Sequence, residues 1–228
     1  MKHQVTRDLF TYWDSLRGGR PAPERSDIDP AEIHQILGDT FILEYENEDQ
    51  LTFRLAGTRL CGSFCRELKG RSFLDIWSQE DIASVRLLLT AVAEDEAAAV
   101  IGFEGKTERD QTLNFETILL PLRHFGQTKS RILGAASPVE MPYWVGIWPL
   151  TELSISSMRL IWPDERPAFM RHSQKDSAPK GRHGIAPSTL AIPNPVAGRP
   201  MSRPNTRSAV QSEQRFGHLR VIEGGRSE

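Results

Sequence analysis

The chain has little cysteine and no long uninterrupted apolar run. Only Cys61 and Cys65 occur among its 228 residues, so they do not form the framework of a disulfide-rich domain. The first ten residues, MKHQVTRDLF, lack the apolar core of a signal peptide. Residues 141–162 are the most apolar region, but Pro149 and several polar residues interrupt them, whereas a membrane helix needs about 20 mostly apolar residues. We therefore expect a soluble cytoplasmic protein with no membrane segment.

The chain also lacks the motifs of common catalytic and metal sites. No Ser-His-Asp order, glycine-rich phosphate loop or histidine metal motif appears in the context that it requires. A structural zinc ion takes four ligands, and Cys61 and Cys65 supply only two. We expect both cysteines to be buried as small apolar side chains. The sequence therefore predicts no catalytic residues and no metal site, although an enzyme of unknown reaction remains an alternative.

Charge and composition change near residue 164. Residues 165–228 contain 11 Lys and Arg against 5 Asp and Glu, whereas residues 1–164 contain 17 against 25. Residues 165–214 are rich in Pro, Ser, Arg and Gly, which predicts a disordered basic linker. Few aromatic side chains and no recognised module occur there, so we expect no specific binding of nucleic acid.

Hydrophobic periodicity predicts the elements of the acidic body. Leu9, Trp13 and Leu16 form one stripe of an N-terminal helix, and Asp29-Pro30 predicts a second, short helix. Two strands, two helices and three strands then follow in chain order: 41–45, 51–56, 58–66, 78–92, 98–106, 111–121 and 130–138.

The strand expected at 111–121 is apolar on both faces. Leu113 and Phe115 lie on one face, and Ile118 and Leu120 lie on the other. A sheet of this kind needs a cover on each face. We expect the later helices to cover one face and the N-terminal helix to cover the other, in its own subunit or in a partner's. A homodimer through this helix and the sheet is one alternative.

Three segments are distinctive: YWDSLRGGRPAPERSDIDPAEI (12–33), FRLAGTRLCGSFCRELKGRSF (53–73) and RILGAASP (131–138). Together they resemble the bacterial single-domain PAS family that was formerly catalogued as a domain of unknown function. FGHLRVIEGGR (216–226) is similar to the short terminal piece of that family. The resemblance implies an α+β fold, with a five-stranded antiparallel sheet, helices on one face, an N-terminal helix and a disordered C-terminal tail.

The resemblance also implies a division of the chain and a pocket. We expect an N-terminal helical cap at 1–38, a PAS domain at 39–164, the linker at 165–214 and a docking segment at 215–228. PAS domains that hold ligands do so between the helices and the concave sheet. The residues expected to line this pocket are Phe53, Leu60, Phe64, Phe73, Trp77, Leu88 and Phe115.

The residues around Cys65 argue against a flavin. Cys65-Arg66-Glu67-Leu68-Lys69-Gly70 shares the Cys, Arg, Leu and Gly spacing of light-sensing PAS domains. Phe64 and Lys69, however, replace an asparagine and a glutamine of that pattern, and Asn114 alone offers a strand amide. An isoalloxazine ring needs several polar partners. Residues 58–97 contain no histidine to ligate a haem. We therefore expect no cofactor.

The expected function is that of a non-enzymatic PAS regulatory module. It would bind a signalling protein in trans through protein–protein contact. The alternative is a sensor whose pocket holds a small molecule or cofactor. A docking segment is expected near the C-terminus, where an apolar extended stretch suits strand addition to an open sheet edge; a frayed end is the other reading. Its apolar residues are Phe216, Leu219, Val221 and Ile222.

Overall fold

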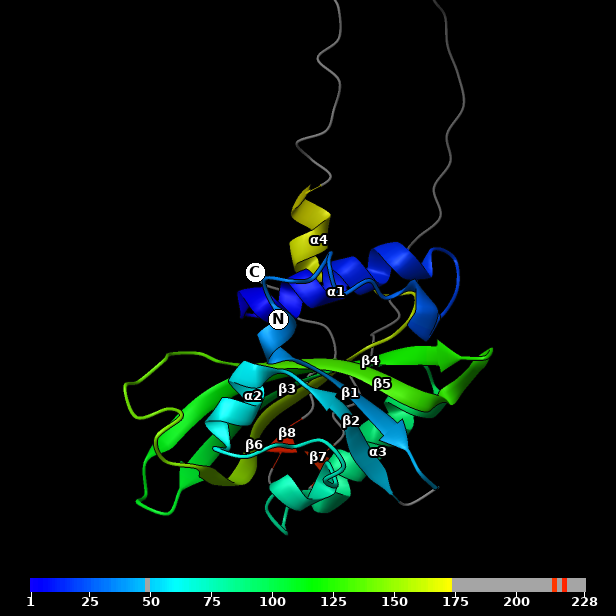
Figure 1. Ribbon diagram of the computed structural model, residues 1–228. Helices are drawn as coiled ribbons and strands as arrows, with labels where there is room; N and C mark the ends of the chain where they lie inside the picture. The colour runs from blue at the N-terminus through cyan, green and yellow to red at the C-terminus, as the bar shows by residue number, and fades with distance from the viewer. Residues whose placement is uncertain (48–49, 174–214, 217–218, 221–228) are drawn as a thin grey trace, which may run out of the picture. The chain divides into compact units, whose positions relative to one another are not determined.

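The computed structural model describes residues 1–47, 50–173, 215–216 and 219–220 (Figure 1). The chain divides into two units: residues 1–165 with 214–228, and residues 166–213. Within the second unit, the described residues form one short helix, α4 (Ala168–Ser173). Most of the linker expected at 165–214 lies outside the described residues, so its disorder and the domain boundaries stay predictions.

The first unit is built on one six-stranded antiparallel sheet with the order β2-β1-β5-β4-β3-β6. Its strands are β1 (Thr40–Tyr45), β2 (Leu51–Ala56), β3 (Ala98–Thr107), β4 (Thr112–His124), β5 (Gln127–Pro138) and β6 (Leu150–Ile161). The α+β PAS-like architecture expected from the sequence is confirmed. The expected number of five strands is wrong by one, because β6 extends the sheet beyond β3.

A bulge hides β6 in the sequence. Lys106 pairs with Glu152 and Thr107 pairs with Leu150, so Thr151 is an extra residue in β6. Its buried positions are Leu150, Leu153, Ile155 and Ile161, so buried and exposed residues do not alternate strictly along the strand. From the sequence, residues 150–161 were therefore interpreted as part of an interrupted apolar region and not as a strand.

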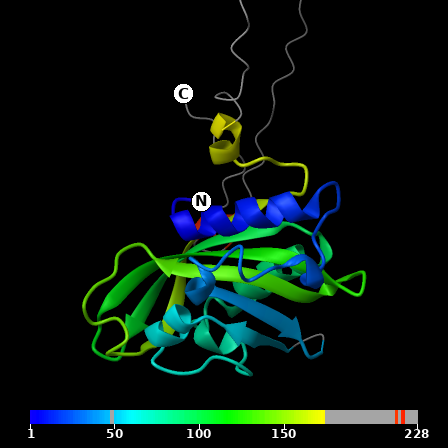
Figure 2. The ribbon, with the colours of Figure 1, turned by 45° about the horizontal axis from the view of Figure 1, so that its top comes forward.

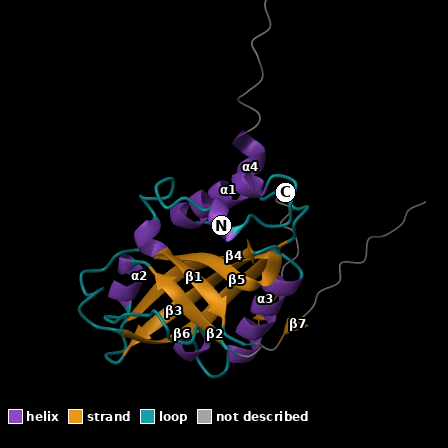
Figure 3. Cartoon of the chain, turned by 45° about the vertical axis from the view of Figure 1, so that its right-hand side comes forward, coloured by secondary structure: helices purple, strands orange, loops and turns teal. Residues whose placement is uncertain are grey.

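Helices cover both faces of the sheet (Figure 3). On one face lies α1 (Gln4–Arg17), and on the other lie α2 (Thr58–Ser63) and α3 (Ile82–Glu94) (Figure 1). Short 3-10 turns link them: η1 (Arg25–Asp27), η2 (Leu37–Asp39) and η3 (Leu74–Ile76). The helix expected after Asp29-Pro30 does not form; residues 30–36 make successive turns that lead into η2.

The N-terminal helix α1 lies across the outer face of the sheet (Figure 2). Leu9, Phe10 and Trp13 are buried, whereas Leu16 is half-buried. The Trp13 indole N–H donates a hydrogen bond to the Pro121 carbonyl of β4 at 2.8 Å. The helix therefore covers the sheet of its own subunit. This is the first of the two arrangements expected from the sequence; the other was cover of a partner's sheet. A homodimer stays a prediction.

One carboxylate fastens the start of α1 to the sheet. Glu116 of β4 accepts hydrogen bonds from the backbone amides of Lys2, at 2.8 and 3.0 Å, and His3, at 2.9 Å, and from the Thr6 hydroxyl. Burial alone would raise the pKa of the Glu116 carboxyl, but the Thr6, Lys2 and His3 hydrogen bonds outweigh it and lower the pKa below its usual value. The hydrogen bonds that hold the start of α1 therefore favour the ionised form of the Glu116 carboxyl.

Acid should weaken this attachment. A carboxyl whose pKa is depressed in the folded state stabilises the fold above its unfolded pKa, about 4.3 for Glu, and this contribution is lost as pH falls through the folded pKa. We expect Glu116→Gln to be less stable than the wild type at about pH 7, with the difference shrinking toward about pH 3. Urea unfolding across this range measures it. The exposed Glu80→Gln is the control, and parallel curves for wild type and Glu116→Gln would contradict the assignment.

The C-terminal segment forms a separate two-stranded sheet in the part that is described. Strands β7 (Arg215–Phe216) and β8 (Leu219–Arg220) pair antiparallel with each other. Of the residues expected to dock, Phe216 and Leu219 are opposite one another in this ladder, while Val221 and Ile222 lie outside the described residues. Docking of the segment stays a prediction.

Candidate functional site

The turn from β2 into α2 sets one wall of the interior. Gly57 precedes α2 with an ordinary φ of −69°, and its amide donates to the Thr40 carbonyl at 2.8 Å. A Cβ at this position would lie 2.3 Å from the Gly38 carbonyl oxygen, so no larger residue fits without moving the backbone. Close packing therefore requires this glycine, whereas its φ is one that any residue can adopt. The turn holds α2 against η2 and the first residue of β1.

Aromatic rings fill the space between the sheet and the segment that follows α2. The Phe73 ring lies 6.0 Å from that of Phe41, 5.5 Å from Phe53 and 5.8 Å from Trp77, measured between ring centroids. Trp77 continues the series to Phe103 of β3 at 5.3 Å. Such offset and edge-to-face pairs contribute beyond the area that they bury. Phe73 therefore packs against β1 and β2, and Trp77 extends the cluster to β3 in the other half of the sheet.

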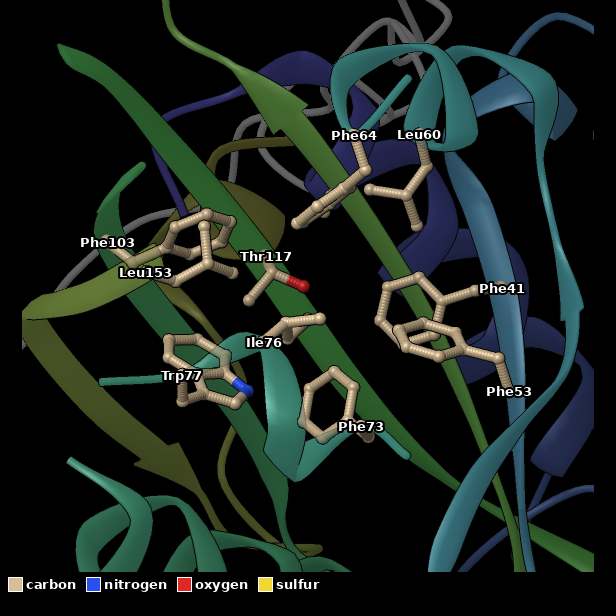
Figure 4. A pocket seen from close by; sticks show the side chains of 11 residues that line it. Phe41, Phe53, Leu60, Phe64, Phe73, Ile76, Trp77, Phe103, Thr117 and Leu153 are labelled. Carbon is tan, nitrogen blue, oxygen red and sulfur yellow. The ribbon is translucent and has the colours of Figure 1, made fainter. Parts of the chain in front are cut away.

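A small cavity lies within these rings (Figure 4). Its volume is about 20 Å³, which is enough for roughly one water molecule. Five of the seven residues expected from the sequence line it: Phe53, Leu60, Phe64, Phe73 and Trp77. Leu88 of α3 and Phe115 of β4 are buried in the surrounding core and are not among the lining residues.

Sequence reasoning missed the other residues of the lining. They are Phe41, Ile76, Phe103, Thr117, Ala136 and Leu153. Strand alternation could have placed Thr117 on the same face as Phe115, since the two are separated by one residue. Leu153 could not be placed, because β6 was not recognised as a strand. The lining is thus drawn from all six strands of the sheet, from α2 and its C-terminal end, and from the segment around η3.

Two lining side chains carry polar atoms, and they differ in their pairing. The Thr117 hydroxyl donates to the Ala135 carbonyl at 2.8 Å. The Trp77 indole nitrogen is buried and has no hydrogen-bond partner among the described residues. Figure 4 shows this nitrogen turned toward the space between Ile76 and Phe73. The Trp77 N–H is thus an unpaired donor within the apolar interior, and the surface of the cavity itself is apolar.

The two cysteines occupy different environments. Cys61 is buried, and burial, together with the nearby Glu67 carboxylate, raises the pKa of its thiol. Cys65 is exposed and lies beyond the end of α2, with a φ of 49°. The expectation that both are buried is therefore wrong for Cys65, because α2 ends at Ser63. Among the described residues, no three His, Cys, Asp or Glu side chains form a metal-ligating group.

The described lining does not fit an isoalloxazine ring. Asn114, the strand amide considered for that role, is exposed on β4. The only polar atoms in the lining are those of Thr117 and Trp77, whereas a flavin needs several donors and acceptors to fix its ring.

A second feature is an ordered apolar loop between β5 and β6. Val139, Met141, Tyr143 and Ile147 are exposed, with Tyr143 at 81%. Trp144, within the same loop, is buried in the hydrophobic core and so attaches the loop to it. In Figure 2 this yellow-green loop extends from one end of the sheet.

Several contacts order this loop. The Ile147 and Trp148 amides both donate to the Trp144 carbonyl, at 2.9 and 3.2 Å. The Arg109 guanidinium lies over the Trp148 ring, 4.6 Å from its centroid. The exposed side chains are therefore presented on a fixed backbone.

The family model described as PAS domain matches residues 1–137, and the chain belongs to this family. PAS domains are sensory modules of signalling proteins, and this class agrees with the observed sheet and its helical cover. The comparison says nothing of a bacterial origin or of an earlier classification. No curated protein matches the chain.

Several solved structures are similar to part of the chain at low identity. A light-oxygen-voltage domain studied with a flavin analogue is 14% identical, with a TM-score of 0.40, over 50% of this chain and 85% of that one. The Rhodobacter sphaeroides LOV protein is 10% identical, with a TM-score of 0.39, over 51% and 71%. The PAS domain of an HTR-like protein from Haloarcula marismortui is 16% identical, with a TM-score of 0.36, over 48% and 90%. The absence of a flavin stays a prediction.

Proposed function

We propose that the protein is a non-enzymatic PAS signalling module that acts by binding another protein in trans. The observation that carries this proposal is the loop at 139–147. Exposed apolar side chains that occur singly are ordinary, but a contiguous group on an ordered loop is typical of an interaction surface. Tyr and Met are enriched at such surfaces. A cytoplasmic location is part of this proposal, and no helix in the described ranges is long and apolar enough to cross a membrane.

The loop also lies next to α2, a helix that contributes to the lining of the interior cavity. A methyl group at Gly146 would lie 3.8 Å from the Gly62 carbonyl oxygen, so the loop passes beside α2. α2 contributes Leu60 to the cavity lining, and Phe64 follows directly after it. A change in the cavity could therefore reach the proposed contact surface through one short helix.

Charged substitutions in the loop should abolish partner binding without unfolding the protein. We expect Met141→Asp and Tyr143→Asp each to reduce co-purification of the partner at least about tenfold, as loss of an interface hot spot of about 2 kcal/mol or more would do. The measurement is quantitative mass spectrometry of proteins captured from cells that naturally express the chain.

Leu87→Asp is the matched control, because Leu87 is an exposed apolar residue, at 55%, on α3. It should leave capture unchanged. A partner set that is the same for the wild type and for both loop variants would refute the proposal, provided that the variants keep the wild-type melting temperature.

A second candidate function is that of a small-molecule sensor. The observation in its favour is the apolar cavity between the sheet and the segment that follows α2. In this function the cavity would take a ligand, and the contact surface on the loop would report its presence.

A further inference from the structure

We infer that residues 215–222 of this chain bind as an added strand to the open edge of β6, which is the side of residues 156–161 that faces away from β3. The occupant of this edge is the chain's own C-terminal segment, not a second copy or another protein. The inference concerns a different surface from the loop at 139–147 and does not depend on the proposed function.

The sheet has two edge strands, and β2 at one edge is already paired. Phe53 of β2 donates its amide to the Arg71 carbonyl at 2.9 Å, and its carbonyl accepts from the Gly70 amide at 2.7 Å. The Leu51 carbonyl accepts from the Phe73 amide at 2.9 Å. The segment after α2 therefore occupies the edge of β2 as a strand would, so a further strand is not expected to add there.

The edge of β6 is occupied over only part of its length. The Leu153 carbonyl accepts from the Ser78 amide at 2.8 Å. The Ile155 amide donates to the Asp81 carboxylate, also at 2.8 Å. In the described part of the chain, no backbone hydrogen bond joins residues 156–161 to a segment other than β3. Free amides and carbonyls along a strand edge are a template for another strand.

Apolar side chains accompany this open edge. Met158 and Leu160 are only half-buried and pack against the hydrophobic core. They lie on the face of β6 that carries the core, because their partners in β3 are the core residues Ile101 and Ala99. An added strand with apolar residues at alternate positions would complete their cover.

The C-terminal segment has the matching pattern and position. Leu219 and Val221 flank Arg220 in the sequence, so a strand through these residues has one apolar face. Strand β8 lies next to β6 within the same unit of the chain, although it pairs with β7 and not with β6. The segment therefore lies beside the strand whose edge is open.

The length of the chain permits this contact within one molecule. Residues 162–214 connect β6 to β7. A fully extended chain of this length reaches roughly 170 Å, whereas a six-stranded sheet is about 25 Å wide. The connection therefore imposes no choice of edge. The edge of β6 is selected by its backbone groups and by its half-buried apolar side chains.

Methionine methyl spectra give a readout with a control in the same molecule. We compare the full chain with the full-length double variant Leu219→Asp, Val221→Asp, in which the apolar face of the segment becomes charged. With ¹³C-labelled methionine methyls, we expect the double variant to shift the Met158 signal and to leave the Met141 signal, on the loop, in place. Removal of residues 215–228 should shift Met158 in the same way.

Amide exchange along β6 provides the second measurement. Alternate amides of residues 156–161 face away from β3. We expect these amides to exchange at least about tenfold more slowly in the wild type than in the double variant, since an added strand would protect them. Arg220→Gln is the matched control, because it leaves the apolar face of the segment intact. It should keep both the slow exchange and the wild-type Met158 signal.

Two results would overturn the inference. One is a double variant that matches the wild type in the Met158 signal and in the exchange of residues 156–161. The other is protection that increases with protein concentration, because the edge would then be occupied by a second copy. Neither result bears on the loop variants, so failure here leaves the protein-contact proposal intact.

Discussion

Phe73→Ala should lower the free energy of unfolding by about 3–5 kcal/mol, as expected for removing a fully packed aromatic side chain. Phe73 is 3% exposed, and its ring contacts those of Phe41, Phe53 and Trp77. Truncation therefore removes contacts to two strands and to the segment after η3 at once. Urea unfolding followed by tryptophan fluorescence measures the loss.

The control for this variant is Leu87→Ala, on the exposed face of α3. It should change the free energy of unfolding by less than about 1 kcal/mol. A loss below about 1 kcal/mol for Phe73→Ala would mean that the aromatic cluster is loosely packed, and the cavity could not then be a defined site.

Removal of residues 1–20 should make the protein aggregate. Without α1, the outer face of β4 would expose Ile118, Leu120 and Leu122, all of which are now fully buried. An exposed apolar patch of this kind drives association. Light scattering after size-exclusion chromatography measures the mass in solution.

Trp13→Phe is the matched control for the truncation. It keeps the apolar cover and removes only the hydrogen bond to Pro121, so we expect a monodisperse protein that is about 1 kcal/mol less stable. A truncated protein with the same mass, solubility and stability as the full chain would show that α1 is dispensable.

The elements of the acidic body could be predicted where local pattern and burial agree. The hairpin of β1 and β2 follows from the apolar stretch at 41–45, the polar turn at 46–50 and the alternating pattern at 51–56. The two-sided burial of β4 likewise predicted that α1 would cover the sheet. The helix expected after Asp29-Pro30 failed because a cap and a proline favour a start but supply no apolar face to hold a helix in place.

The cavity was only partly predictable for a different reason. Residues of the 53–77 stretch were identified because the resemblance to the PAS family implied a pocket between the helices and the sheet, and the large apolar residues of this stretch are close together in sequence. Which residues of β3, β5 and β6 face them depends on the register of the sheet, including the bulge at Thr151. The unpaired state of the Trp77 indole depends on every neighbour around it, and no local pattern encodes this.

The claim that the loop at 139–147 is the contact surface can be tested most directly by site-specific photo-crosslinking in cells that naturally express the protein. A photoreactive phenylalanine analogue at Tyr143, 81% exposed, should yield a crosslinked species of defined mass. The same analogue at Leu87 on α3 should yield none. No adduct at position 143, or the same adducts at both positions, would contradict the account.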